Sequence, residues 1–197
     1  MKKLITALVA ASCLSACVPI IFVGGAAMGM WVGSDPRRPD VIKSDFDLDA
    51  QLEAKIIDTY KERAHVNVHV FNDVVLLTGE VPDQAAKQQI EQFAGQMNKK
   101  PRMVYNEVVI ALPSSTSNKF NDSQITTRVK TAVLAEAGDS SAVHIMVTTE
   151  RQVVYLMGVS KPGIIDRAAA AASKVGGVKQ VVKLVEIEPD GPADTAR

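Results

Sequence analysis

An internal repeat constrains the fold of this 197-residue chain more than any other feature, because one pattern of about 65 residues occurs twice. In the first copy, apolar residues recur every three or four positions between 48 and 60, which indicates a helix. Alternating residues over 65–71 and an apolar run over 74–79 then predict a hairpin. Pro82-Asp83 opens a second helix, and residues 104–110 form a closing strand. The predicted order is helix, strand, strand, helix, strand.

The second copy keeps this order after a polar linker, residues 113–121. Asp122 or Ser123 can cap its first helix, as Asp45 or Asp47 can cap the first helix of the earlier copy. The matching landmarks follow in the same order in both copies. They are Gly79 and Gly158 at the ends of the hairpins, Pro82 and Pro162 before the second helices, and the valines of the last strands. We expect both glycines to be structural, at a bulge or a close approach of backbone.

These patterns predict an α+β fold of two tandem αββαβ domains, over residues 47–112 and 122–188, with a disordered tail over 189–197. Each domain should have a three-stranded mixed sheet with two helices on one face. The valines of the first strand, Val66, Val68 and Val70, should face the helices, which leaves His65, Asn67 and His69 on the open face. Such a face could dock a partner or pack against the other copy, and the small core of each unit favours packing between the copies.

The beginning of the chain has the pattern of an export signal. Residues 1–16 combine Lys2 and Lys3 with an apolar run and no acidic residue. The sequence Leu14-Ser15-Ala16-Cys17 resembles the bacterial lipobox, in which the cysteine is lipidated and becomes the new N-terminus. Two or three acyl chains, at about 0.8 kcal/mol per buried methylene, would hold Cys17 on a bilayer. Val18 rather than Asp at the next position implies outer-membrane sorting by resemblance to enteric lipoproteins. The alternative is a soluble exported protein with a chance cysteine.

The segment over residues 17–46 is predicted to be the lipidated N-terminus and a membrane-proximal stalk. Gly25, Gly29 and Gly33 recur every four residues, and on a helix they would form a flat stripe suited to packing in lipid or against a partner. A flexible tether is the alternative. The prolines over 35–39 should break any helix, so we expect ordered structure to begin near Asp47.

Composition and motifs argue against an enzyme. The 22 basic and 22 acidic residues balance, so no bulk field indicates nucleic-acid binding. Once the leader is removed, Cys17 alone remains and no internal disulfide can form. His65 and His69 share a strand face, but no cysteine or acid is evident beside them as a third metal ligand. No Gly-x-Ser-x-Gly motif occurs. We therefore expect no catalytic residue, no metal and no cofactor.

Several motifs together resemble the BON domain. They are the hairpin ends Leu76-Leu77-Thr78-Gly79 and Leu156-Met157-Gly158, the stretches Val104-Tyr105-Asn106-Glu107 and Gly177-Val178-Lys179-Gln180-Val181, and the helix start Ile125-Thr126-Thr127-Arg128-Val129. Two such units behind a lipobox resemble the dual-BON outer-membrane lipoproteins of the DolP (YraP-like) family. The resemblance implies a lipid-anchored, periplasm-facing protein that binds anionic phospholipid through its second BON domain. It also implies a role in envelope integrity, often at the division site.

The charge distribution agrees with a lipid-binding second unit. Residues 48–112 hold 7 basic and 9 acidic residues, whereas residues 119–188 hold 9 basic and 7 acidic ones. We predict phospholipid contact through Phe120, Gln124, Arg128 and Lys130, away from the apolar stripe of the helix. The resemblance places an aromatic residue at the position of Gln124, so Phe120 would carry the insertion here. An ordinary solvated helix face is the alternative. A second function class is an interaction scaffold that docks onto an envelope protein through the open sheet faces or the glycine-rich stalk.

Overall fold

The computed structural model describes residues 37–137 and 144–187. The predicted signal peptide, the predicted lipidation site Cys17, the glycine stripe of the predicted stalk and the tail over 189–197 lie outside the described residues. From Arg37 onward the described residues form one compact unit. Among them, no helix is both long and apolar enough to span a bilayer.

The first half has the predicted order of elements, with its last strand in two pieces. It contains α3 (Pro39–Tyr60), the short 3₁₀ helix η3 (Lys61–Arg63), β1 (His65–Phe71), β2 (Val74–Val81), α4 (Gln84–Gly95), β3 (Met103–Asn106) and β4 (Val109–Ile110). β1 pairs antiparallel with β2, while β3 and β4 both pair parallel with β2. Between β3 and β4 the side chain of Val108 is buried, and its carbonyl accepts a hydrogen bond from Lys87 Nζ at 2.8 Å. The expected single strand is therefore interrupted at this point.

The second half repeats the topology. It contains α5 (Thr116–Ala137), β5 (Ile145–Glu150), β6 (Val153–Ser160), α6 (Pro162–Ser173) and β7 (Gln180–Ile187). β5 pairs antiparallel with β6, and β7 pairs parallel with β6. Both sheets are mixed, as the αββαβ order requires, because a parallel pair needs a helical crossover and an antiparallel pair needs only a tight turn. The predicted fold of two tandem αββαβ domains is confirmed.

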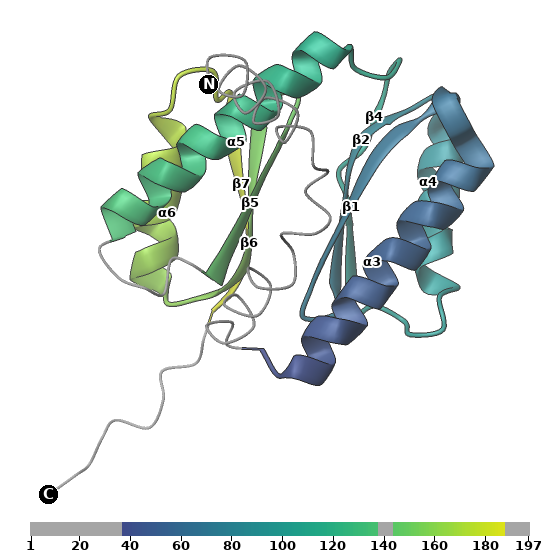
Figure 1. Ribbon diagram of the computed structural model, residues 1–197, viewed down its shortest axis with the longest axis horizontal. Coiled ribbons are helices and arrows are strands. Elements are labelled where there is room, and N and C mark those ends of the chain that lie inside the picture. Colours follow the sequence, from purple (N-terminus) through teal and green to yellow (C-terminus); the bar gives the residue numbers. More distant parts are fainter. Residues whose placement is uncertain (1–36, 138–143, 188–197) are drawn as a thin grey trace, which may run out of the picture. The chain divides into compact units, whose positions relative to one another are not determined.

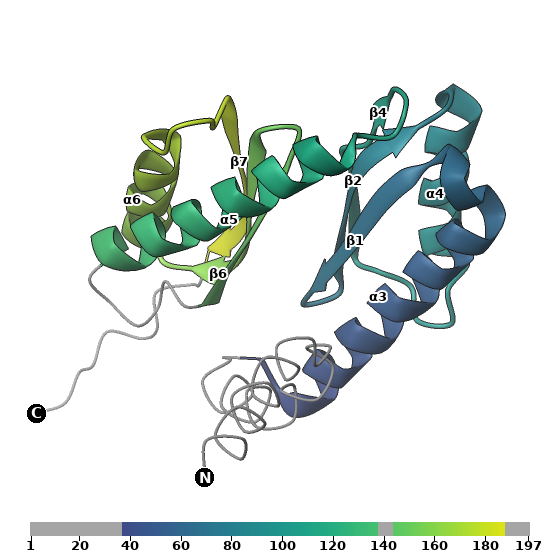
Figure 2. The same cartoon turned by 45° about the horizontal axis from the view of Figure 1, so that its top comes forward.

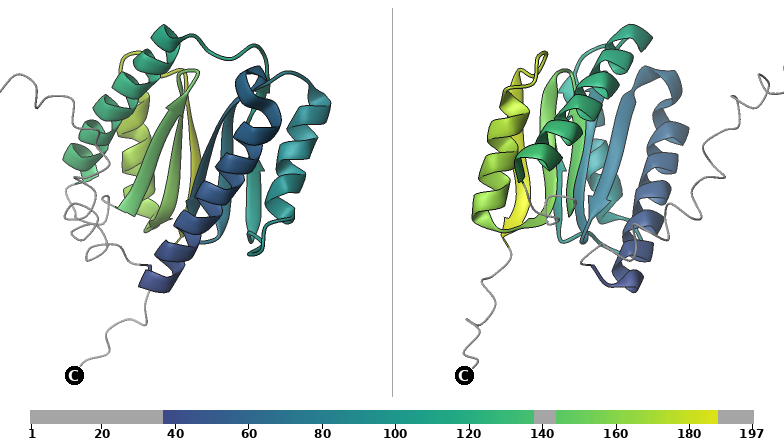
Figure 3. Two further views of the ribbon diagram at one scale, coloured as in Figure 1. Left: turned by 45° about the vertical axis from the view of Figure 1, so that its right-hand side comes forward. Right: turned by 60° about the vertical axis from the view of Figure 1, so that its left-hand side comes forward.

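Each sheet carries its two helices on one face. Figures 1 and 3 show α3 and α4 together on one face of the first sheet, and Figure 2 shows α5 and α6 on one face of the second. Val66, Val68 and Val70 are buried with the apolar sides of α3 and α4, and Ile145 and Val147 are buried with those of α5 and α6. The period-two prediction of which valines face the helices is therefore correct.

The two open sheet faces bury a third cluster of apolar side chains. Phe71, Val74 and Leu76 from the first sheet pack with Tyr155 and Met157 from the second. Packing between the two copies is one of the two outcomes predicted for the open faces, the other being the docking of a partner. Covering both faces in this way removes apolar surface from water that a unit of this size could not bury alone.

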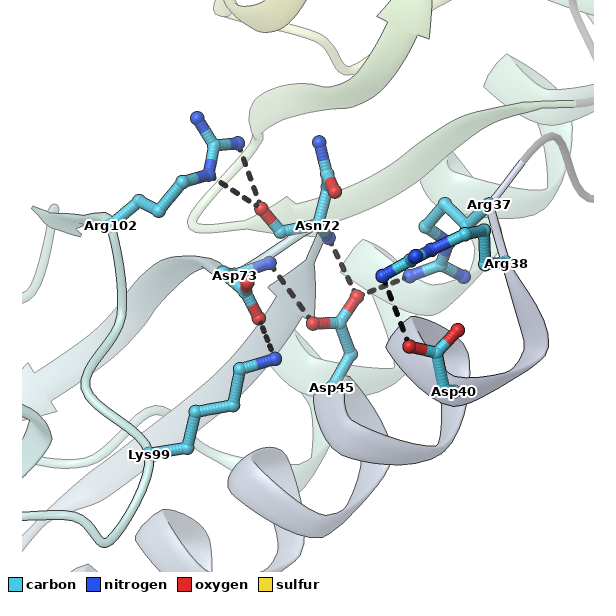
Figure 4. Close-up of polar contacts among 8 residues, drawn as sticks. All are labelled: Arg37, Arg38, Asp40, Asp45, Asn72, Asp73, Lys99 and Arg102. Carbon is cyan, nitrogen blue, oxygen red and sulfur yellow. Dashed lines mark hydrogen bonds and ion pairs between the residues drawn. The ribbon is translucent and has the colours of Figure 1, made fainter.

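Both first helices begin earlier than the sequence indicated. α3 begins at Pro39, where a proline is tolerated because the first N–H groups of a helix need no intrahelical acceptor. Residues 39–46 therefore belong to the first domain and not to the stalk. Asp45 lies inside α3 and does not cap it. Its carboxylate accepts hydrogen bonds from the backbone N–H groups of Asn72 at 2.6 Å and Asp73 at 3.0 Å, and Arg37 lies at 2.7 Å from it (Figure 4).

The same correction applies to the second domain. α5 begins at Thr116, so the last six residues assigned to the linker, 116–121, are helical. Asp122 is buried in α5 and binds the backbone of the β5–β6 turn. By contrast, the starts of the two second helices are as predicted. Asp83 caps α4 by accepting a hydrogen bond from Ala86 N at 2.8 Å, and α6 begins at Pro162.

Gly79 and Gly158 occupy equivalent places in the two hairpins. Gly79 pairs with Val66 and has φ +110°, and Gly158 pairs with Ile145 and has φ +149°. A Cβ at Gly79 would lie 2.0 Å from His65 O, and one at Gly158 would lie 2.4 Å from His144 O. The close approach of backbone predicted for both positions is therefore present.

Candidate functional site

The outer face of α5 is the first candidate site. One side of this 22-residue helix is anchored in the second core by Ile125, Val129 and Val133. On the other side two large apolar residues are exposed to solvent, Phe120 at 65% and Leu134 at 51%. An exposed phenylalanine on a well-anchored helix is a group that can enter an apolar environment without unfolding the domain.

The structure brings three of the four predicted lipid-binding residues together. Phe120, Gln124 and Arg128 follow one another at intervals of four, so they form one row along the exposed side of α5. Arg128 Nε donates to the carbonyl of Gln124 at 3.4 Å, and the guanidinium lies beside Gly177 in the turn before β7. This row has an apolar end at Phe120 and a cationic end at Arg128.

Lys130 is also exposed, but it lies on the other flank of α5. Two residues along a helix correspond to a rotation of about 200°, so Lys130 and Arg128 point to different sides. The positive charge of its ammonium group interacts electrostatically with His69 of the first domain. Burial of His69 lowers the pKa of its imidazole, and the positive charge of Lys130 lowers it further. Lys130 therefore does not extend the row formed by Phe120, Gln124 and Arg128.

An open cleft of about 280 Å³ adjoins the N-terminal half of α5. The cleft is lined by Ser114, Asn118, Asn121, Asp122, Arg151, Gln152 and Lys179. Arg151 and Lys179 place two cationic side chains in a polar setting. Such a combination suits a hydrated anionic group better than an apolar ligand.

The second candidate site is a cluster of polar side chains between the two sheets, centred on Glu80. The side chain of Glu80 is fully buried. His65 Nδ1 lies 3.0 Å from its Oε2, Arg151 Nη1 lies 3.1 Å from its Oε1, and Ser114 Oγ also bonds to Oε1. Burial raises the pKa of Glu80, but the hydrogen bonds from Ser114, His65 and Arg151 outweigh this effect and hold the pKa below its usual value. Glu80 is therefore a buried carboxylate.

Glu150 reaches the same cluster from the end of β5. It is only 6% exposed, and its Oε2 accepts a hydrogen bond from Asn67 Nδ2 at 2.7 Å. Its Oε1 is buried and has no hydrogen-bond partner among the described residues. Burial, together with the nearby carboxylates of Glu80 and Asp122, raises the pKa of Glu150 to about 7. Two buried acids from different sheets therefore meet beside one histidine.

Sequence reasoning missed this cluster. It considered His65 with His69 and found no acid nearby, whereas His69 Nε2 contacts Thr148 Oγ1 at 3.1 Å and His65 contacts Glu80. Glu80 could have been found, because the hairpin register places it directly opposite His65. No local pattern points to Glu150, since it reaches the cluster only through the packing of the second sheet on the first.

The repeated αββαβ topology and the equivalent glycines of its two hairpins define a class of α+β proteins built from two copies of one small domain. The sequence profile of the BON domain matches residues 44–111 and 121–189. The chain therefore belongs to the BON-domain family and contains two BON domains. The family profile and the related proteins indicate no catalytic family.

Curated relatives share most of the chain. It is 31% identical over 186 residues to the outer membrane lipoprotein DolP of Haemophilus influenzae. The aligned region covers 93% of this chain and 95% of that protein. It is 33% identical over 125 residues to a 21 kDa hemolysin of Actinobacillus pleuropneumoniae, covering 64% of this chain and 63% of that protein. A solved structure of CdsD, a structural protein of the type III secretion system of Chlamydia trachomatis, is 12% identical with a TM-score of 0.30. The match covers 73% of this chain and 93% of CdsD.

Proposed function

We propose that this protein is a lipid-anchored outer-membrane lipoprotein whose second BON domain binds anionic phospholipid through the outer face of α5. In this role it would support envelope integrity, including at the division site. The observation that carries the proposal is the row of Phe120, Gln124 and Arg128 on a helix whose opposite side is buried in the domain core. The similarity to DolP over nearly the whole chain supports the anchor and the compartment.

The physical basis is a combination of shallow insertion and charge attraction. The aromatic ring of Phe120 can enter the boundary between headgroups and acyl chains, where its apolar surface leaves water. A cation near an anionic membrane contributes about 1 kcal/mol. Arg128 stands in the row itself, and Arg151 and Lys179 line the adjoining cleft, where a phosphate could be received. Lys130 contributes only to the general positive field of the helix.

Vesicle sedimentation tests this assignment. Reversing Arg128 and Lys130 together to glutamate should weaken binding to phosphatidylglycerol vesicles by more than tenfold, because each reversal replaces an attraction by a repulsion. Phe120→Ala should also weaken binding, with less dependence on salt. Of the single reversals, Arg128→Glu should have the larger effect, because Lys130 lies on the other flank.

The matched control is the double reversal of Lys43 and Lys61 on the first domain. Both side chains are exposed, and reversing two lysines changes the net charge by the same amount as reversing Arg128 and Lys130. This control should bind like the parent protein. Equal weakening by both double reversals, or by neither, would refute the assignment of the lipid site to α5.

The anchor has its own test. Mass spectrometry of membrane-extracted protein should show that residues 1–16 are missing and that Cys17 carries the acyl mass. Cys17→Ser should release the protein from the membrane fraction. Acylation of the Cys17→Ser variant through Cys13 would place the anchor elsewhere.

The alternative function is that of an interaction scaffold, which would dock onto an envelope protein through the open sheet faces or the glycine-rich stalk. The first of these two routes is less favoured. Docking through open sheet faces requires those faces to be available, whereas Phe71, Leu76, Tyr155 and Met157 bury them against each other. Vesicle binding by the purified protein in the absence of any protein partner would further separate lipid binding from scaffolding.

A further inference from the structure

We propose that His65, Glu80 and Glu150 form a binding site for a divalent transition-metal ion of the zinc type, and that this ion links the two BON domains. One potential ligand atom from each of the three side chains lies within 4.8 Å of the other two. His65 and Glu80 face each other across the β1–β2 hairpin, whereas Glu150 ends β5. None of these three residues belongs to the row of Phe120, Gln124 and Arg128, although Arg151 borders both places.

The atom that points to a cation is Glu150 Oε1. It belongs to a side chain that is only 6% exposed, and it has no hydrogen-bond donor among the described residues. A buried carboxylate oxygen without a partner is costly, and a cation beside it removes that cost. Glu80 Oε2, with His65 as its contact, provides the second carboxylate oxygen.

Hydrogen bonds from neighbouring side chains hold one oxygen of each carboxylate in place, as is common for metal ligands. Asn67 Nδ2 holds Glu150 Oε2 at 2.7 Å, while Ser114 and Arg151 hold Glu80 Oε1. One oxygen of each carboxylate is thus held by hydrogen bonds, while Glu80 Oε2 contacts only the imidazole of His65 and Glu150 Oε1 has no donor among the described residues. Groups that orient ligands from behind in this manner are typical of metal sites in proteins.

The donor set favours zinc over calcium or magnesium. One imidazole and two carboxylates suit Zn²⁺, whereas Ca²⁺ and Mg²⁺ prefer oxygen ligands alone. Ligand atoms about 2.1 Å from a tetrahedral ion lie roughly 3.4 Å apart. The 3.0 Å separation of His65 Nδ1 and Glu80 Oε2 is near this value, and rotation of the Glu150 side chain would complete the set. A water molecule would fill the fourth position.

Charge and access are compatible with an ion at this place. Arg151 pairs with Glu80, so the charge of an ionised Glu150 would remain for a cation to balance when His65 is neutral. Ser114 and Arg151, which contact Glu80, also line the open cleft beside α5. The cleft provides a route from solvent to the edge of the cluster.

The test is a zinc titration of the full mature chain without an affinity tag, followed by calorimetry and thermal unfolding. One equivalent of Zn²⁺ should bind and raise the melting temperature, and EDTA should reverse the shift. Glu150→Gln and His65→Gln should each weaken zinc binding by more than tenfold. Co²⁺ absorption in the visible range gives a second readout of nitrogen and oxygen ligation that does not depend on stability.

The matched controls are the other two histidines, since His69→Gln and His144→Gln remove an imidazole outside the cluster. Both should bind zinc like the parent protein. Circular dichroism should show that Glu150→Gln folds, because glutamine has the same shape. No zinc binding, undiminished binding by Glu150→Gln, or loss of binding on changing His144 would each overturn the proposal. In the first of these cases a proton, and not a metal ion, would satisfy Glu150.

Discussion

Asp122 binds the backbone of the hairpin turn in the second BON domain, as Asp45 does in the first. Its carboxylate accepts hydrogen bonds from Arg151 N at 2.8 Å and Gln152 N at 3.0 Å, the two residues at the turn of the β5–β6 hairpin. Asp45 binds the N–H groups of the β1–β2 turn in the same way. All four turn residues have positive φ, between 51° and 67°, which L-residues adopt at a cost. One buried carboxylate from the first helix thus holds each turn in the conformation that a tight hairpin needs.

Replacing either aspartate with alanine should destabilise the protein. Each change leaves two backbone N–H groups without their acceptor, which costs about 1–3 kcal/mol of the free energy of unfolding. Asp122→Ala should cost at least as much as Asp45→Ala, because Arg151 and Gln152 tolerate positive φ less well than Asn72 and Asp73. Urea unfolding measures this. The exposed Asp40→Ala is the control, with an expected change within about 0.5 kcal/mol; an equal loss in this control would contradict the assignment.

Substitution of Gly79 or Gly158 by alanine should be severe at both positions. The new Cβ would lie against a backbone carbonyl, that of His65 or His144, and the strand cannot yield locally. Strain and disrupted pairing together should lower the free energy of unfolding by about 3 kcal/mol or more. Gly95→Ala is the control, because nothing lies within 4 Å of the added Cβ. It should be neutral or stabilising by up to about 1 kcal/mol. A mild effect at Gly158 alone would show that the two hairpins are not equivalent.

The pH dependence of stability should include a contribution from Asp49. Burial, together with the charge of Glu53 one helical turn away, raises the pKa of this carboxyl from 3.8 to about 6. The folded state therefore holds more protons than the unfolded state between about pH 4 and pH 6, so stability should fall as the pH rises through this window. The loss should be about 2 kcal/mol, since one pKa unit corresponds to about 1.4 kcal/mol and the site is partly solvated.

Asp49→Asn should flatten this part of the profile, because asparagine keeps the shape and does not titrate. Asp47→Asn, two residues earlier on the same helix, should leave the profile unchanged. Denaturation midpoints at pH 4, 5, 6 and 7 provide the comparison. Identical profiles for Asp49→Asn and the parent protein would contradict the shifted pKa.

Two neighbouring leucines on β2 separate the core of one domain from the contact between the domains. Leu76 packs between the sheets and Leu77 packs under the helices, and both are fully buried. Either change to alanine should cost about 2–5 kcal/mol. Leu76→Ala should also uncouple the domains, so that calorimetry shows two transitions in place of one. Leu77→Ala should lower the melting temperature without separating the transitions. The reverse result would mean that the sheets are not coupled through this cluster.

The local pattern of residues was sufficient to predict the repeat and much of its packing. Val66, Val68 and Val70 alternate with polar residues, and a strand has no other way to bury them on one side. Asp83 before an apolar helix and Pro162 at a helix start act through their own backbone and near neighbours, so their roles could be read from sequence. Gly79 and Gly158 recur after the same apolar run and carry the same conformational requirement.

Tertiary structure decided what the polar residues of the helices and strand ends do. Asp45 and Asp122 have the sequence position of helix caps, but the turns that they bind lie about 28 residues further along the chain, and the helices extend past them. Glu150 meets His65 and Glu80 only because one sheet packs on the other. Hydrophobic periodicity follows from the geometry of a single helix or strand. The partner of a buried charged group, by contrast, depends on which elements lie next to each other, and this is determined by the packing of the whole chain.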